Sequence, residues 1–362
     1  MSVSLRVKQS YVLDSLNLFS ILTGHTFYTS RHPEEWAWWQ ERLSPSAREA
    51  IDQAQAIYGS HMLGPVLVLL VSAVPGFGDM PLPALLADTQ RILTHYQHFP
   101  YYEQEIWPQH ERMLQTLAPV AVYLEEQGLF EHWRTLHLPK VQADINRLEA
   151  FLGTFDFDLG QAMADMHGRG TAGVDGDIRV YVCSYAKPHG IKLCGRQFIT
   201  QTGLEPRRTL QIAIHEMFHP PYQADALKTE LAGLIADPLF QDCWQRKDPT
   251  FGYDTELAFL EENVVEAITV LLGERAGVVS DPVGYLVGRE GDVYRMAVVL
   301  YAAMRRQPKL DPMEPFGVYF QRLVAGLDVG RLTERFQGAL AEWQDERGAE
   351  FPRGGSTSGR AI

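Results

Sequence analysis

The feature that most constrains the fold is the segment AIHEMFHPPYQAD at residues 213–225, where a helical pattern ends abruptly. Apolar residues lead into it at every fourth position, which is the stripe of a buried helix: Leu210, Ile214 and Phe218. Pro220 and Pro221 follow, and proline lacks the N–H that a helix interior needs. Proline also disfavours helical geometry in the residue before it. The sequence therefore predicts a buried helix that ends at about His219.

This predicted helix carries the residue types of a metal site. His215 and His219 are four apart, so a helix directs both imidazoles to the same side. Neutral imidazole is a good zinc ligand, and two can fill two corners of a tetrahedron. Glu216 is rotated by about 100° from His215, so its carboxylate can take a proton from a water on such a metal. The alternative is that both histidines are ordinary core or capping residues.

HEMFH has the form HExxH, and here the chain resembles the zinc metallopeptidases. The resemblance covers residues 178–270 or so and implies an enzyme that hydrolyses peptide bonds, with a peptide or protein as substrate. It also implies one Zn²⁺ per chain, bound by His215 and His219, with Glu216 as the general base.

Catalytic zinc needs a third protein ligand, and Glu262 is the first candidate. Glu262 and Glu266 are four apart in EENVVEA, so they share a helix face on which one could bind metal and the other support a ligand histidine. The neighbouring Glu261 has a valine four residues on and lacks such a pair. The arrangement looks like that of the gluzincins, although that family usually has aspartate where this chain has Glu266.

Asp225 is the second candidate. HEMFHPPYQAD matches the spacing of the metzincin pattern in its variant with a final aspartate. That pattern needs a glycine where this chain has Tyr222, and tyrosine is strained at positive φ. We therefore expect Glu262, and not Asp225, to complete the site.

The rest of the chain predicts an α+β fold that is mostly α-helical. Residues 1–150 are expected to form an α-rich N-terminal region, because their apolar residues have three-to-four spacing. A zincin-like catalytic domain with a small sheet and an active-site helix is expected over 151–345, followed by a flexible tail at 346–362. IRVYVCSYA at 178–186 alternates like a strand, and IKLCGRQFITQ at 191–201 is expected to return beside it, with an edge that could pair with a substrate peptide.

Composition narrows the partners. The net charge of −13, without long Lys/Arg runs, argues against nucleic acid as a main partner. The most apolar run, at 66–74, is too short for a membrane span of about 20 residues and predicts a buried strand or core helix. Three cysteines without a CxxC pair suggest free, mostly buried thiols: Cys183, Cys194 and Cys243. We expect a soluble cytoplasmic protein. The oligomeric state is left open.

Two other functions fit part of the sequence. A peptidase-like fold could serve only in binding or regulation, although the presence of Glu216 argues against this. A helical structural protein without metal is the other possibility. The donor that would stabilise an oxyanion is left open among several side chains: His189, Tyr285, Tyr294, Tyr301 and Tyr319.

Overall fold

The computed structural model describes residues 5–58, 62–100, 102–169, 177–188, 190–248, 253–288 and 292–350. It is mostly helical with one small four-stranded mixed sheet, which confirms the predicted mostly helical α+β class.

The chain forms two compact units, and they divide it differently from the prediction. One unit comprises Met1–Gln161 with Asp175–Met217, and the other Ala162–Val174 with Phe218–Ile362. No break falls near residue 150, because the N-terminal strand β1 (Leu5–Lys8) pairs in parallel with β2. The first helices and the sheet therefore share one unit. Pairing across so long a stretch of chain leaves no local periodicity from which it could be predicted.

The sheet of the first unit has the strand order β1-β2-β4-β3. The central strand β2 (Ile178–Cys183) is parallel to β4 (Gln197–Gln201), and β3 (Ile191–Leu193) is antiparallel to β4 at the edge. The expected hairpin between 178–186 and 191–201 is therefore wrong. IKLCGRQFITQ itself makes a hairpin of β3 and β4, and β4 inserts between β2 and β3.

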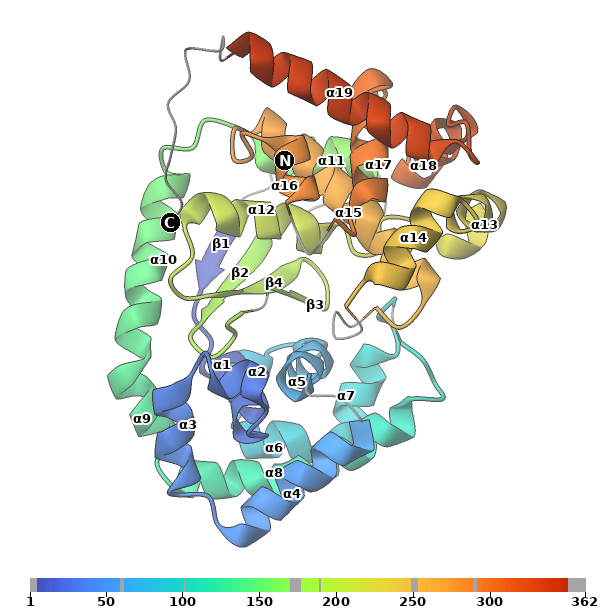
Figure 1. The fold of residues 1–362 in the computed structure, drawn as a ribbon. Helices are drawn as coiled ribbons and strands as arrows, with labels where there is room; N and C mark the ends of the chain where they lie inside the picture. Colours follow the sequence, from blue (N-terminus) through green and yellow to red (C-terminus); the bar gives the residue numbers. More distant parts are fainter. Residues whose placement is uncertain are drawn as a thin grey trace, which may run out of the picture. The chain divides into compact units, whose positions relative to one another are not determined.

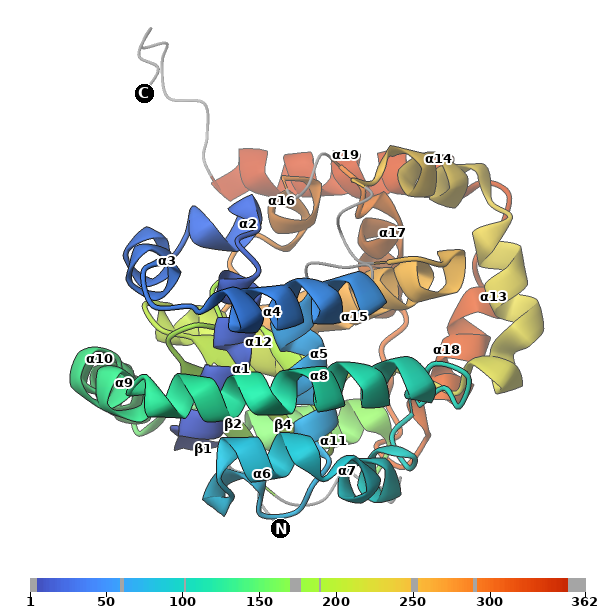
Figure 2. The same ribbon diagram turned by 90° about the horizontal axis from the view of Figure 1, so that it is seen from below.

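The helices of the first unit surround this sheet. Figure 1 shows α1 and α5 below the sheet with α4 and α8 beyond them, and Figure 2 shows α4 and α8 side by side. The apolar run at 66–74 falls largely in the core helix α5, one of the two expected outcomes. The bounds are α1 (Tyr11–Leu22), α2 (Thr26–Thr29), α3 (Pro33–Gln40), α4 (Pro45–Tyr58), α5 (Leu63–Ser72), α6 (Leu82–Ala87), α7 (Thr89–Tyr96), α8 (Trp107–Glu126), α9 (Leu129–Leu136), α10 (Leu138–Leu152) and α12 (Pro206–Met217), with a 3₁₀ turn at Phe77–Asp79.

The second unit is helical and is built around α15. Nearly all of α15 from Phe259 to Gly273 is buried, and the Asn263 side chain fixes it to α17 by accepting a hydrogen bond from the Ala297 amide at 3.1 Å. Its helices are α13 (Lys228–Ile235), α14 (Pro238–Arg246), α15 (Glu256–Arg275), α16 (Pro282–Val287), α17 (Arg295–Arg306), α18 (Phe316–Ala325) and α19 (Leu332–Glu350), with a 3₁₀ turn at Ala224–Leu227. The remaining helix of the described residues is α11 (Leu159–His167).

The last helix extends beyond the predicted start of the tail. The flexible tail was expected from 346, but α19 continues to Glu350, and residues 351–362 lie outside the described part. All three cysteines are free; Cys183 and Cys243 are buried and Cys194 is half-buried, as expected.

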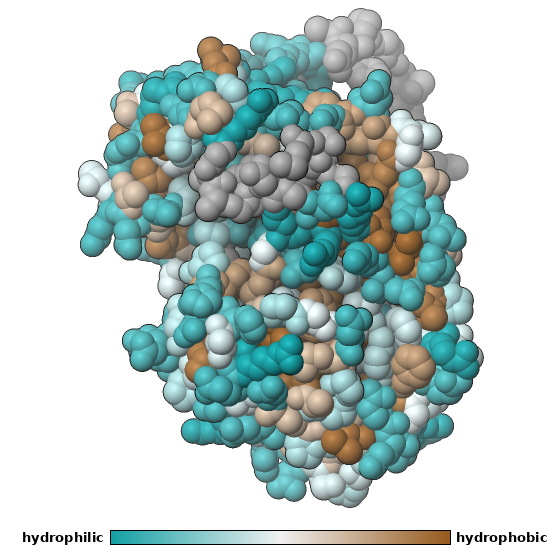
Figure 3. Space-filling view, turned by 180° about the vertical axis from the view of Figure 1, so that it is seen from behind, coloured by the Kyte–Doolittle hydropathy of each residue, from teal (hydrophilic) through white to brown (hydrophobic). Residues whose placement is uncertain are grey.

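No single helix in the described ranges is both long and apolar enough to cross a membrane, although α4 and α5 pass that test together across an 81° bend. On the face drawn in Figure 3, hydrophilic side chains cover most of the surface and hydrophobic ones are scattered among them.

The buried His110 of α8 predicts a loss of stability at mildly acidic pH. Burial lowers its pKa to about 4, whereas an unfolded histidine has a pKa of about 6.5. Between these values the unfolded chain binds the extra proton, so the free energy of unfolding decreases as pH falls, by at most about 1.4 kcal/mol per pH unit. His110→Phe keeps an aromatic ring beside Tyr58 but cannot titrate. In urea denaturation between about pH 6.5 and pH 4.5, the variant should lose less stability than the wild type; equal slopes would contradict this prediction.

Candidate metal centre

The motif begins on α12, the last helix of the first unit. α12 has Leu210 and Ile214 on its fully buried stripe and ends at Met217, two residues before the predicted end. His219 lies just past the helix and is followed by Pro220 and Pro221. The early end fits the known scatter of helix boundaries and the effect of proline on preceding residues.

Glu216 faces the edge strand of the sheet. Its side chain is buried, and a Cβ added to Gly190, which precedes β3, would lie 3.2 Å from Glu216 Oε1 and 2.6 Å from Ile212 Cγ2. Lys192 on β3 donates a hydrogen bond to the Gly195 carbonyl at 2.8 Å. Burial lowers the pKa of Lys192 to about 8, while the nearby Glu216 carboxylate acts in the opposite direction. The Glu216 carboxylate therefore lies in a narrow space beside Gly190, with the Lys192 ammonium group nearby.

His219 and Glu262 meet in the second unit. His219 Nε2 lies 3.4 Å from Glu262 Oε2, and the Glu262 side chain is only 5% exposed. Two ligands at about 2.0–2.1 Å from a tetrahedral zinc ion are roughly 3.3–3.4 Å apart. The separation is long for a hydrogen bond and fits two ligands of one ion. His215, His219 and Glu262 form one of the groups of described residues that could hold a metal ion.

Glu261 orients the ring of His219. Its Oε1 lies 3.2 Å from His219 Nδ1, on the opposite edge of the ring from Glu262. A proton shared between Nδ1 and a carboxylate leaves the lone pair of Nε2 available for a metal. Helical spacing alone favours Glu262 over Glu261, which has no carboxylate one turn further on. The overlooked signal is that two consecutive glutamates differ by about 100° around a helix, so they can approach one imidazole from two sides.

Glu266 is buried on α15, one turn beyond Glu262. Its predicted support of a ligand histidine stays a prediction, whereas the support of His219 by Glu261 is visible in the structure.

Tyr253 is a further member of the site, and no pattern in the sequence predicts it. Its hydroxyl forms a hydrogen bond with the Glu262 carboxylate. Burial, and then the charge of Glu262, raises the pKa of Tyr253 well above its usual range. Tyr253 precedes the Thr255 cap of α15, so helical spacing could not connect it with Glu262.

Asp225 is exposed in the 3₁₀ turn and belongs to none of the donor groups found among the described residues. Tyr222 does not adopt the positive φ that the metzincin turn requires. Its ring is buried and stacks on Phe320, with centroids 5.2 Å apart. The chain after His219 therefore packs into its own unit, which agrees with the preference for Glu262.

Two of the candidate oxyanion donors have hydroxyl groups that already donate to other side chains or carbonyls. The Tyr301 hydroxyl donates to Glu274 at 2.7 Å, and the Tyr319 hydroxyl to the Gln307 carbonyl at 2.9 Å, so both hydroxyl protons are already engaged. His189 lies outside the described residues.

Comparison with models of protein families gave no match, and comparisons with curated proteins and with solved structures gave none either.

The close approach of Gly190 to α12 predicts that Gly190→Ala disturbs Glu216. The new methyl group would have to push Ile212 aside, which typically costs about 1–3 kcal/mol. Gly78→Ala is a matched control, since a Cβ there meets nothing within 4 Å. Urea denaturation should show a loss of stability for Gly190→Ala and little change for Gly78→Ala. Equal stabilities for the two variants would show that β3 does not press on this face of α12.

Proposed function

We propose that the protein is a zinc-dependent metallopeptidase of the gluzincin type. The observation that carries this proposal is the pairing of His219 Nε2 with Glu262 Oε2 at 3.4 Å, with Glu261 on the other ring nitrogen. A helix-end histidine and a buried carboxylate from a distant helix have come together at the separation that a shared ion requires. His215, His219 and Glu262 would be the metal ligands, with Glu266 as a further support.

The donor set fits zinc. Two imidazole nitrogens and one carboxylate oxygen are a ligand combination that catalytic zinc uses, and three protein ligands leave a fourth position for water or substrate. When bound, zinc supplies a Lewis acid that polarises a carbonyl and makes a water more acidic.

The remaining steps belong to the side chains. Glu216 follows His215 directly on α12, so it can accept the proton of the attacking water and pass it to the departing amine. Glu261 holds the ring of His219 through Nδ1. Tyr253 holds the carboxylate of Glu262 through its hydroxyl, which limits the rotation of that side chain.

The edge strand β3 gives the proposal a substrate side. β3 pairs with β4 along one edge, so an extended peptide could add to its other edge by main-chain hydrogen bonds. Glu216 lies near this strand, since a Cβ added to Gly190 would be 3.2 Å from its Oε1. A peptide or protein is therefore the proposed substrate. The three free thiols fit a reducing compartment, and we propose the cytoplasm.

A binding or regulatory protein with the same fold is the competing proposal. Such a protein needs the ligands but has no need of a carboxylate at position 216, whereas an enzyme needs both.

Glu216→Gln separates the two. The variant should keep its zinc, because Glu216 is not a ligand, and lose peptide cleavage by about 10²–10⁴-fold, because the proton acceptor is gone. Zinc content and the rate of cleavage of a peptide library should be measured together. Glu126→Gln, an exposed change on α8, is the matched control and should leave both values unchanged. Cleavage that persists in Glu216→Gln would remove this residue from its role.

The third ligand can be tested by comparing Glu262→Ala with Asp225→Ala. Loss of Glu262 removes a buried donor, so the affinity for zinc should fall by more than the roughly 10–100-fold that loss of an outer support usually causes. Loss of the exposed Asp225 should have no effect. Competition with a chromogenic chelator gives both affinities, and the assignment is wrong if only Asp225→Ala weakens binding.

A further inference from the structure

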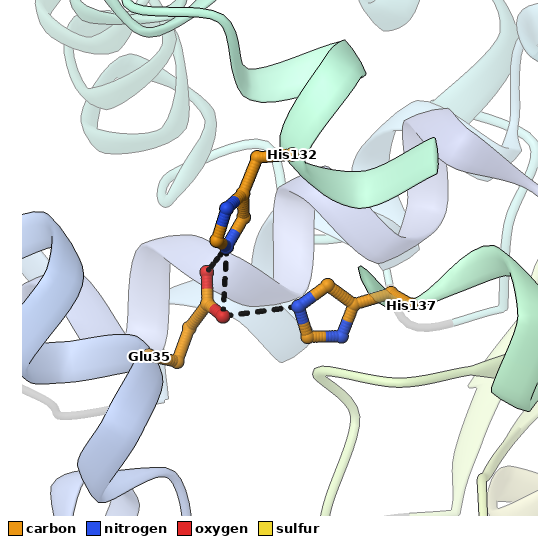
Figure 4. A group of neighbouring side chains, drawn as sticks. All are labelled: Glu35, His132 and His137. Atoms are coloured by element: carbon orange, nitrogen blue, oxygen red, sulfur yellow. Dashed lines mark hydrogen bonds and ion pairs between the residues drawn. The ribbon is translucent and has the colours of Figure 1, made fainter. Parts of the chain in front are cut away.

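A second group of metal-binding side chain types lies within the first unit, and the proposed peptidase reaction makes no use of it. It consists of Glu35 on α3, His132 on α9 and His137 at the junction of α9 and α10, and Figure 4 shows the three side chains converging. Their side chains are 8%, 7% and 10% exposed. Two parts of the chain that are distant in sequence therefore direct donor atoms into one interior place.

The donor atoms are close enough to share an ion. His132 Nε2 lies 3.0 and 3.1 Å from the two Glu35 oxygens, and His137 Nε2 lies 3.0 Å from Oε2. Bonds of about 2.0–2.1 Å to a zinc-sized ion, with angles of about 95–105°, separate donors by roughly 3.0–3.3 Å. The same distances also suit hydrogen bonds. Small movements of these side chains would therefore convert the hydrogen-bonded arrangement into a metal-bound one.

The second oxygen of Glu35 and the second ring nitrogen of His137 already have hydrogen-bond partners. Glu35 Oε1 accepts hydrogen bonds from Trp39 Nε1 at 2.7 Å and from the Tyr185 hydroxyl at 2.9 Å, which leaves Oε2 for a metal. His137 Nδ1 lies 2.7 Å from the Ser184 hydroxyl, so its Nε2 points to Glu35. Contacts of this kind around the ligands fix ring orientation and carboxylate geometry in metal sites.

The charge of the group calls for a cation. The ion pairs of the buried Glu35 carboxylate in the described structure are with His132 and His137. A buried anion needs a neighbouring positive charge, which either an imidazolium or a bound metal ion can supply.

We propose that Glu35, His132 and His137 bind a second divalent cation of the zinc type. The ion would tie α3 to α9 and to the start of α10, and the burial of the site gives it a structural role. The ion would take the place of the hydrogen-bond contacts between the two imidazoles and Glu35. This site is independent of the HExxH residues and does not rest on the proposed peptidase activity.

Metal analysis of the full-length chain tests this proposal. Protein purified from zinc-supplied cells should contain two zinc ions per chain, one of which is lost in Glu35→Gln. The double variant His215→Asn/His219→Asn should retain one zinc, and the combined triple variant should retain none. If the HExxH site binds no metal, the wild type holds one zinc that Glu35→Gln removes, so failure of the first proposal can be recognised.

A second measurement covers the case in which Glu35→Gln does not fold. Added zinc should raise the melting temperature of the His215→Asn/His219→Asn protein, because the ion binds the folded chain. The proposal is overturned if this double variant neither contains zinc nor changes its melting temperature on zinc titration, or if a folded Glu35→Gln protein keeps the full zinc content of the wild type. The group would then be a hydrogen-bonded ion pair alone.

Discussion

A carboxylate that leaves water loses a hydration that only a nearby positive charge or several hydrogen-bond donors can replace. This constraint determines how Glu262 can sit in the middle of α15. The helix is buried on nearly every side from Phe259 to Gly273, so the Glu262 side chain is withdrawn from solvent to 5% exposure. His219 and Tyr253 are the partners that approach it, and each depends on the packing of α15. The burial of this helix and the assembly of the candidate site are therefore one event, and a change that exposed α15 would also disperse the site.

The same constraint has two different solutions in the first unit. Asp14, within the buried helix α1, accepts hydrogen bonds from the Trp133 indole and from the Ser184 and Tyr185 amides at 2.7–2.9 Å. Burial nevertheless raises its pKa. Glu35 also accepts neutral donors, but two histidines join them, and its pKa is lowered instead. Both histidines hydrogen-bond the Glu35 carboxylate directly, whereas His137 acts on Asp14 only through its charge. The two imidazoles in contact with Glu35 are the feature that suits the proposed second cation site.

The sequence was most informative where the determining interactions are local. Helical spacing places His215 and Glu216 on α12, and the proline pair brings that helix to an end near the predicted residue. Spacing also pairs Glu262 with a buried face, although only the fold could bring that face to His219. The prediction was wrong for the strands, because a period of two shows that a segment is a strand but not which neighbour it takes. Tyr253 and the Glu35 group were missed for the same reason: their partners are distant in sequence or outside any helix.

The N-terminal helices support the edge of the sheet, and this role follows from the strand order β1-β2-β4-β3. The sequence alone does not predict that order. Because β4 inserts next to β2, the hairpin of β3 and β4 is carried to the edge of the sheet, where it needs support from outside. That support comes from the end of α5: the Ser72 hydroxyl accepts a hydrogen bond from the Cys194 amide at 3.0 Å, and the Leu69 carbonyl lies 3.6 Å from Cys194 Sγ. The turn that is held in this way follows Lys192, which approaches Glu216. A helix near the start of the chain thus positions the strand beside the proposed catalytic base, so the N-terminal helices are part of the framework of the site.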